Sequence, residues 1–271
     1  MKYFIIAGEQ SGDLHGSNLV RELFRSDPRA EIECWGGDLM ESAGARLRVH
    51  YRETAFMGFM EVAKNLGRIR KNFDRCKQQI SEFKPDAVIL VDYPGFNFRM
   101  ARFAKESGYK VLYYISPKIW AWKEGRVELV RKYVDRMYII FPFEVGFYRK
   151  HNIEVEYRGN PLLDETEKKI ARLPGKDELR TALGLGEKPV IAMLAGSRKS
   201  EVKQVLPQML RAVGNFPDYQ FVLAGVKNLP DELYLRLTAG TGVRVLKDRT
   251  YEILSVSEAA LVTSGTATLE T

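Results

Sequence analysis

The sequence predicts an α/β protein with two Rossmann-like domains. Apolar strand candidates alternate with helical patterns in two separate blocks, which is typical of parallel sheets covered by helices. Between the blocks, residues 158–189 are rich in proline, glycine and charge, and so indicate a connection between domains. At 271 residues the chain is also longer than one ordinary domain. We therefore expect an N-terminal domain at 1–164 and a C-terminal domain at 165–271.

The first block opens with the strand candidate "YFIIA" at 3–7, followed by a helix from about Asp13. A long helix is expected at about 59–83, where apolar residues recur at helical spacing between basic ones. The other strands expected in this block are at 31–37, 87–91, 110–115 and 136–140.

The second block has a helix from about Ser200 and strand candidates at 190–194, 220–224, 243–246 and 259–263. It ends in "LVTSGTATLET", where a strand and a Ser-Gly turn begin a helix that stops within its first turns. A helix normally needs about 10 residues to pack usefully. We therefore expect the last part of the second domain to be missing from this sequence.

Composition and charge exclude several classes of protein. No apolar run approaches the roughly 20 residues that a membrane helix needs. Cys34 and Cys76 lack the spacing of a disulfide framework or a zinc site, which favours a reducing cytoplasm. The net charge of +7 favours an anionic partner. No nucleic-acid recognition motif surrounds the basic residues, so we expect no nucleic-acid binding.

The segment "LAGSRKSEV" (194–202) is a candidate anion site, because it leaves a strand and enters a helix. Gly196 lets backbone amides approach a diphosphate closely, while Ser197 and Arg198 face the anion with the helix N-terminus. Arg198 adds a fixed charge and a fork of donors. An ordinary capped helix start is the alternative.

The later segment "TSGTATLE" repeats this strand-to-turn pattern. It offers Ser264, Gly265 and Thr266 as donors and Glu270 as an acceptor for sugar hydroxyls. The alternative for Glu270 is a first-turn charge that the helix dipole favours.

The N-terminal loop "AGEQSGDLHG" spaces its glycines four apart and matches no nucleotide fingerprint. Glu9, Ser11 and Asp13 are nevertheless placed to bind substrate hydroxyls, and Asp13 is equally suited to cap a helix.

A carboxylate, Asp92, ends the strand at 87–91 in front of a Tyr-Pro-Gly turn. It either faces a ligand at the carboxyl end of the sheet or only caps the turn. Trp120 and Trp122, in "YYISPKIWAWKEGRV", either stack on a sugar or acyl chain or pack in the core.

Seven stretches occur together and in a fixed order: "GEQSGDLHG", "MGFMEV", "VDYPGFNFRMA", "YYISPKIWAW", "FPFEVGFYRKHNIEVEYRGNPLLD", "GSRKSEV" and "SGTATLE". Together they resemble the lipid-A-disaccharide synthase family of glycosyltransferases over essentially the whole chain. Several of the stretches are too long for chance agreement. The resemblance implies a GT-B fold, in which two Rossmann-like domains face a cleft, with the second domain incomplete here.

The resemblance also implies an inverting glycosyl transfer in lipid A biosynthesis, a step of lipopolysaccharide synthesis. UDP-2,3-diacylglucosamine would donate its sugar to 2,3-diacylglucosamine 1-phosphate, forming lipid A disaccharide 1-phosphate and UDP. These two substrates are the expected partners, and a homodimer is the oligomer expected of a full-length chain. No Asp-x-Asp motif occurs, so we expect neither a metal nor another cofactor.

The resemblance assigns roles by position. Asp92 matches the family's catalytic aspartate, the base that takes the proton of the acceptor hydroxyl. The residues matched to the UDP donor are Gly196, Ser197, Arg198, Ser264, Gly265, Thr266 and Glu270. Weaker candidates for the acceptor pocket are Glu9, Ser11 and Asn97.

Four positions depart from the family pattern. Gln10 stands where alanine is common, Lys118 where glutamine is common, Ala195 where proline is common, and Asn160 where histidine is frequent. These changes concern substrate preference and loop stiffness more than reaction type, and Lys118 adds affinity for an anionic substrate.

Both implied substrates carry acyl chains, so the resemblance implies a cytoplasmic protein that works peripherally at the inner face of the cytoplasmic membrane. Residues 54–71 combine apolar side chains with a basic helix that suits such a surface. A solvated helix face is the alternative. The expected membrane-contact residues are Phe56, Met57, Phe59, Met60, Arg68, Arg70 and Lys71.

Two other functions remain open. One is another GT-B enzyme acting on a soluble UDP-sugar, such as a UDP-GlcNAc epimerase-like protein, which would be indifferent to acyl chains. The other is a truncated chain that binds lipid or nucleotide but catalyses nothing.

Overall fold

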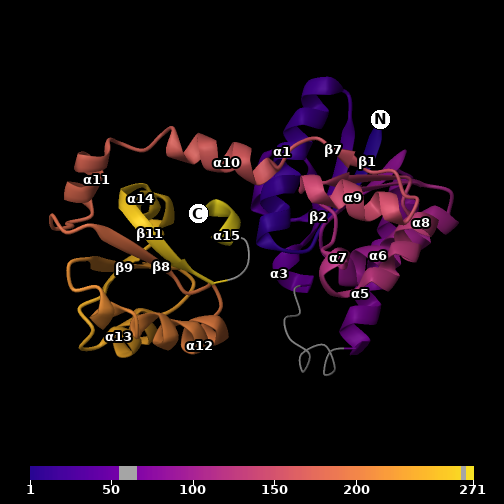
Figure 1. Ribbon diagram of the computed structural model, residues 1–271. Coiled ribbons are helices and arrows are strands. Elements are labelled where there is room, and N and C mark those ends of the chain that lie inside the picture. The colour runs from indigo at the N-terminus through magenta and orange to yellow at the C-terminus, as the bar shows by residue number, and fades with distance from the viewer. Residues whose placement is uncertain (55–65, 264–266) are drawn as a thin grey trace. The chain divides into compact units, whose positions relative to one another are not determined.

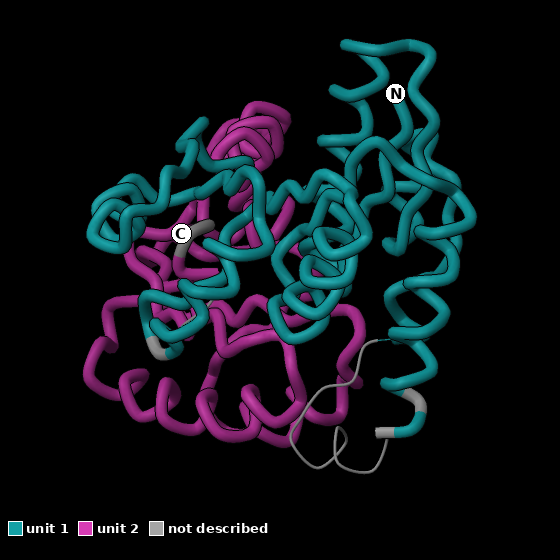
Figure 2. Tube along the Cα trace, turned by 90° about the vertical axis from the view of Figure 1, so that its right-hand side faces the viewer, with its two compact units in different colours: residues 1–161 teal, residues 162–271 magenta. Residues whose placement is uncertain are grey.

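The computed structural model describes residues 1–54, 66–263 and 267–271. The chain divides into two compact units, unit 1 at Met1–Pro161 and unit 2 at Leu162–Thr271 (Figure 2). Each unit is built on a parallel sheet with helices packed on it, as the sequence predicts (Figure 1). None of the helices that the structure describes is long and apolar enough to cross a lipid bilayer.

The described strands of unit 1 form one sheet in the order β3-β2-β1-β4-β5-β6-β7. Their bounds are β1 (Lys2–Ala7), β2 (Glu31–Gly36), β3 (Arg46–His50), β4 (Ala87–Val91), β5 (Lys110–Tyr114), β6 (Arg136–Ile139) and β7 (Glu156–Tyr157). The edge strands β3 and β7 were not predicted. β3 reads "RLRVH" and β7 has only two residues, so neither carries the apolar run that marks the inner strands.

The helices of unit 1 cover both faces of this sheet. They are α1 (Gln10–Ser26), α2 (Asp38–Ser42), α3 (Tyr51–Thr54), α5 (Leu66–Phe83), α6 (Pro94–Glu106), α7 (Ile119–Trp122), η1 (Glu124–Arg126), α8 (Val127–Tyr133) and α9 (Pro142–Lys150). Successive strand residues point to opposite faces. Phe4 and Ile6 of β1 therefore join the core under α5, α6 and α8, while Ile5 and Ala7 join the core under α1 and α2.

Unit 2 begins with helix α10 (Pro161–Ile170), whose first residue still belongs to unit 1. Its described strands form a parallel sheet in the order β10-β9-β8-β11. The elements are α11 (Lys176–Ala182), β8 (Val190–Leu194), α12 (Lys199–Leu210), η2 (Val213–Asn215), β9 (Gln220–Gly225), α13 (Asp231–Thr238), β10 (Arg244–Lys247), α14 (Thr250–Val256), β11 (Ser257–Val262) and α15 (Ala267–Glu270). Residues of β8 again alternate between two cores, with α12 and α13 over one and α11 and α14 over the other.

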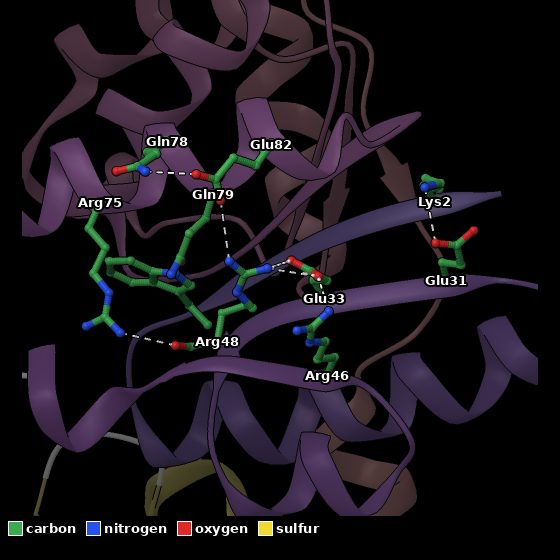
Figure 3. Close-up of polar contacts among 10 residues, drawn as sticks. Lys2, Glu31, Glu33, Arg46, Arg48, Arg75, Gln78, Gln79 and Glu82 are labelled. Atoms are coloured by element: carbon green, nitrogen blue, oxygen red, sulfur yellow. Dashed lines mark hydrogen bonds and ion pairs between the residues drawn. The ribbon is translucent and has the colours of Figure 1, made fainter.

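A polar cluster covers one edge of the unit 1 sheet (Figure 3). The buried carboxylate of Glu33, on β2, accepts hydrogen bonds from Arg48 on β3 at 2.8 and 3.0 Å and from Arg46 at 3.4 Å. A buried charge needs partners of this kind. Beside it, the indole N–H of Trp35 donates to the side-chain oxygen of Gln79 at 2.7 Å, which ties β2 to helix α5.

The carboxylate of Asp13 fixes the turn after β2. It is 2% exposed and accepts hydrogen bonds from the backbone N–H groups of Gly37 (2.8 Å), Leu39 (3.1 Å) and Met40 (3.1 Å). Helix α1 begins at Gln10, so Asp13 lies inside it and does not cap it. Asp13 caps the start of α2 instead, a tertiary contact that no local pattern reveals.

Asp13→Ala should lower the free energy of unfolding by about 3 kcal/mol, because three backbone donors, two of them buried, lose a charged acceptor. Urea unfolding measures the change. The matched control is Glu22→Gln on the exposed face of the same helix, which should stay within about 0.5 kcal/mol of the wild type. An equal, small effect in both variants would contradict the capping role.

Candidate active site

The first residues after β4 adopt an unusual backbone conformation. Asp92 and Tyr93 have φ angles of +42° and +48°, in the left-handed region that residues other than glycine seldom occupy. Ile115, directly after the neighbouring strand β5, has a φ of +66°. For a β-branched or bulky residue such a conformation is strained, and strain of this kind concentrates at functional sites. The carboxyl ends of β4 and β5 therefore mark a candidate active site.

Hydrogen bonds to the main chain hold Asp92 in this conformation. Its N–H donates to the carbonyl of Tyr114 at 3.1 Å. Its carbonyl accepts from the hydroxyl of Tyr113 at 2.6 Å and from the amide nitrogen of Asn97 at 2.7 Å. The backbone of Asp92 is thus fixed on both sides by hydrogen bonds that do not use its carboxylate.

The buried side chain of Asn97 supports the backbone at Asp92 from the protein interior. Its side chain is fully buried on α6, and its amide nitrogen also donates to the carbonyl of Val91 at 3.1 Å and of Ile6 at 3.4 Å. In this arrangement Asn97 joins the ends of β1 and β4 beneath Asp92. Binding of the acceptor by Asn97 remains a prediction, and the contacts described here are those of a positioning residue.

The carboxyl of Asp92 has a pKa raised to about 6. Asp92 is exposed as a residue, but protein atoms crowd its carboxyl group, and this loss of water is the main cause. The negative charge of Glu9 raises the pKa further, while Lys118 and the N–H of Tyr93 lower it. A carboxylate with a pKa near 6 is better matched to taking a proton near neutral pH than an ordinary aspartate.

Glu9 and Ser11 lie at the same end of the sheet. Ala7, the last residue of β1, pairs with Val91, the last residue of the parallel strand β4. The two strands therefore end side by side, and the segments that follow them carry Glu9 and Asp92. Both Glu9 and Ser11 are exposed. The structure therefore brings the predicted acceptor residues Glu9 and Ser11 to the strand ends that carry Asp92.

The loop after β5 forms the third part of this surface. Ser116 donates to the buried carboxylate of Glu144 at 2.8 Å, and its oxygen lies 3.0 Å from the hydroxyl of Tyr148. Trp120 is 37% exposed and meets the ring of Phe143 edge-on, with centroids 4.8 Å apart. Trp120 is thus partly available for stacking, and the side chain of Trp122 lies outside the described residues.

The loop of unit 2 that is predicted to bind an anion joins β8 to α12, as the sequence indicates, and anion binding there stays a prediction. Gly196 follows β8 with a φ of +102°, and α12 begins three residues later at Lys199. The backbone N–H groups of Ser197 and Arg198 both donate to one carboxylate oxygen of Glu201, at 3.2 Å each. Sequence reasoning missed Glu201, although a glutamate three residues after a helix cap is a known capping signal. The carboxylate of Glu201 therefore occupies the two backbone amides that were predicted to bind an anionic ligand.

Several predicted residues cannot be placed. Ser264, Gly265 and Thr266 lie outside the described residues, and of Glu270 only the backbone, in α15, is described. The membrane-contact candidates Phe56, Met57, Phe59 and Met60 also lie outside the described residues, and of Arg68 only the backbone, in α5, is described. Arg70 and Lys71 are exposed on α5. In the part of the chain that is described, no group of three His, Cys, Asp or Glu side chains is arranged to hold a metal ion.

Solved structures of low sequence identity share this fold. The UDP-GlcNAc 2-epimerase of Neisseria meningitidis bound to UDP-GlcNAc superposes with a TM-score of 0.69 at 14% identity, covering 98% of this chain and 78% of that one. The enzyme of Methanocaldococcus jannaschii in complex with UDP-GlcNAc and UDP gives 0.69 at 13% identity, covering 100% and 81%. These likenesses establish a GT-B fold and nothing about the reaction.

Sequence comparison is more specific. The lipid-A-disaccharide synthase of Geobacter sulfurreducens is 40% identical over 276 residues, which cover 99% of this chain and 71% of that protein. The lipid-A-disaccharide synthase of Coxiella burnetii is 35% identical over 271 residues, covering 98% and 71%. A sequence model described as lipid-A-disaccharide synthetase matches residues 3–271. The chain therefore belongs to the lipid-A-disaccharide synthetase family.

Proposed function

We propose that this chain transfers 2,3-diacylglucosamine from its UDP donor to 2,3-diacylglucosamine 1-phosphate with inversion, releasing UDP. Family membership supports the reaction, since the relatives at 35–40% identity are named lipid-A-disaccharide synthases. The observation that carries the mechanism is the position of Asp92, directly after β4 in a left-handed backbone conformation that Asn97 and Tyr113 hold in place. The alternative of an epimerase-like enzyme on a soluble UDP-sugar rests on a shared fold alone.

In this mechanism the carboxylate of Asp92 takes the proton from the attacking acceptor hydroxyl. The hydroxyl oxygen bonds to the anomeric carbon of the donor as the bond to the UDP oxygen breaks. The proton ends on Asp92, and the electron pair of the broken bond leaves with UDP. Asn97 and Tyr113 hold the backbone of Asp92 during this step.

The leaving diphosphate needs positive groups as its charge develops. We assign this role to Arg198 and to the backbone amides of Ser197 and Arg198 at the start of α12. Glu201 now accepts from both amides. Donor binding therefore requires its carboxylate to move, or the diphosphate to bind beside it through the Arg198 side chain, which is 55% exposed. Ser264, Gly265, Thr266 and Glu270 remain proposed partners of the donor phosphate and ribose.

Asp92→Asn should lower kcat by about a hundred- to ten-thousand-fold, the usual contribution of a general base, with little change in UDP affinity. UDP release from UDP-diacylglucosamine and diacylglucosamine 1-phosphate measures kcat, and calorimetry measures UDP binding. Asp86, directly before the first residue of β4, supplies the control, because Asp86→Asn alters an exposed carboxylate at the opposite end of the strand from Asp92 and should keep activity. Full activity in Asp92→Asn would leave Asp92 only a structural role.

The pH dependence of kcat/KM should reveal the charges around Asp92. A base must be unprotonated, so activity should fall as the pH drops through about 6. Glu9→Gln removes a negative charge and should move this acid limb to lower pH, whereas Lys118→Gln removes a positive charge and should move it to higher pH.

The control for this series is Glu22→Gln, a similar neutralisation on the exposed side of α1, which should leave the midpoint in place. Midpoints that move in the same direction for Glu9→Gln and Lys118→Gln would show that another group controls the limb.

We also propose that residues 54–71 bring the protein to a membrane surface, because both proposed substrates carry acyl chains. Arg70 and Lys71 are exposed on α5, as contact with lipid phosphates requires. The expected homodimer remains a prediction.

Replacing Arg68, Arg70 and Lys71 together by glutamate should weaken binding to vesicles with anionic lipid by at least about 100-fold, since each basic residue near such a surface contributes about 1 kcal/mol. Sedimentation with vesicles measures the binding. The control with the same change in net charge replaces Lys132, Arg149 and Lys150, which are exposed on α8 and α9. An equal loss in the control would assign the binding to net charge alone.

A further inference from the structure

A cavity of about 230 Å³ in unit 1 is lined by Tyr93, the residue after Asp92, and has no part in the mechanism above. Its lining is mostly apolar and includes the side chains of Trp35, Ile69, Phe73, Tyr93 and Phe96. These side chains come from β2, from α5 and from the start of α6, so the cavity lies on the face of the sheet that α5 and α6 cover.

Stacked aromatic rings give the cavity a rigid wall. Phe96 stacks on Phe73 with centroids 4.5 Å apart, on Trp35 at 5.4 Å and on Tyr93 at 5.8 Å. Trp35 is fixed further by its hydrogen bond to Gln79. A wall held by stacking and hydrogen bonding does not collapse easily into the space beside it.

The strained backbone after β4 links the cavity to the base. Tyr93 is the residue next to Asp92, and its ring lies over Gly8, where an added Cβ would come within 2.2 Å of the ring. Gly8 and Gly95 also line the cavity. The same stretch of left-handed backbone therefore carries the proposed base and, at the next residue, an aromatic ring that lines the cavity.

We propose that this cavity binds part of an acyl chain of the acceptor. Its volume exceeds the roughly 150 Å³ of an apolar cavity that holds benzene, so it admits a segment of an alkyl chain. Such a lining offers few partners for a polar group and suits a hydrocarbon. The inference rests on the proposed function, and it goes beyond that function by giving an acyl chain a site within the protein, separate from the membrane surface.

The acceptor fits this site better than the donor does. Asp92 acts on a hydroxyl of the acceptor sugar, so that sugar must lie against Asp92, and its acyl chains start a few bonds from the ring. Arg99 also lines the cavity, with its guanidinium carbon 4.9 Å from the ring centroid of Phe73. A cation next to an apolar cavity is complementary to a substrate that joins a phosphate to an acyl chain. Acceptor and donor share that chemistry, so the position of Asp92 is what favours the acceptor.

The test compares acceptors whose acyl chains lengthen one methylene at a time, with the donor held constant. In the wild type, kcat/KM should rise about fourfold for each methylene buried until the cavity is filled, and then level off. Ile69→Trp fills the cavity from α5, so the gain in kcat/KM per methylene should fall toward onefold. Ile69→Phe is a milder second variant in case the larger side chain impairs folding.

The matched control is Asp74→Trp, which adds the same side chain to an exposed position of the same helix and should keep the wild-type slope. An unchanged slope in both Ile69 variants would overturn the proposal. The proposal would also be overturned if Ile69→Trp abolished the dependence of kcat/KM on the length of the donor's acyl chains but not on the length of the acceptor's.

A second readout does not depend on turnover. A brominated medium-chain fatty acid quenches the fluorescence of a tryptophan that it contacts, and Trp35 lines the cavity. Saturable quenching that is lost in Trp35→Phe would support the cavity as an acyl site. If such quenching were seen but no substrate pair were turned over, the proposed function would be contradicted and the acyl site would still be supported. Equal quenching in the wild type and Trp35→Phe would place the fatty acid near Trp120 or Trp122 and overturn the proposal.

Discussion

The left-handed pair at Asp92 and Tyr93 is the constraint on which the active face of unit 1 depends. Each residue in this conformation costs about 1–3 kcal/mol, so the surrounding structure must offset that cost. Asn97 and Tyr113 do so through the carbonyl of Asp92, and the missing side chain of Gly8 makes room for the Tyr93 ring. The orientation of the base is therefore set by groups that lie behind it.

Placing such a site at strand ends follows from the architecture. In a parallel sheet the carboxyl ends of neighbouring strands meet at one edge, so β1, β4 and β5 deliver Glu9, Asp92 and the loop of Lys118 to one place. Their charges act on one another there, and the loss of water around the Asp92 carboxyl together with the charge of Glu9 raises the pKa of Asp92. Unit 2 applies the same rule at β8, where Gly196 lets the chain enter α12 with two amides aligned.

Much of this arrangement was predictable from local pattern. The apolar runs at 87–91 and 190–194 are the strands β4 and β8, and the strand-end positions of Asp92 and Gly196 follow directly. Features that join distant segments were not predictable. Asp13 caps a helix more than twenty residues away, and the aromatic wall assembles Trp35, Phe73 and Phe96 from three elements. Only the folded chain brings such residues together.

The two borders of the unit 1 sheet have a consequence for self-association. Exposed strand borders can pair with another chain and so promote aggregation, and proteins discourage this with charged or very short border strands. Among the described strands, β3 carries Arg46 and Arg48 and β7 has two residues. Pairing two copies through their β3 borders would place Arg46 and Arg48 of one copy against those of the other. Continuation of this sheet through β3 is therefore an unfavourable way for unit 1 to meet a second copy.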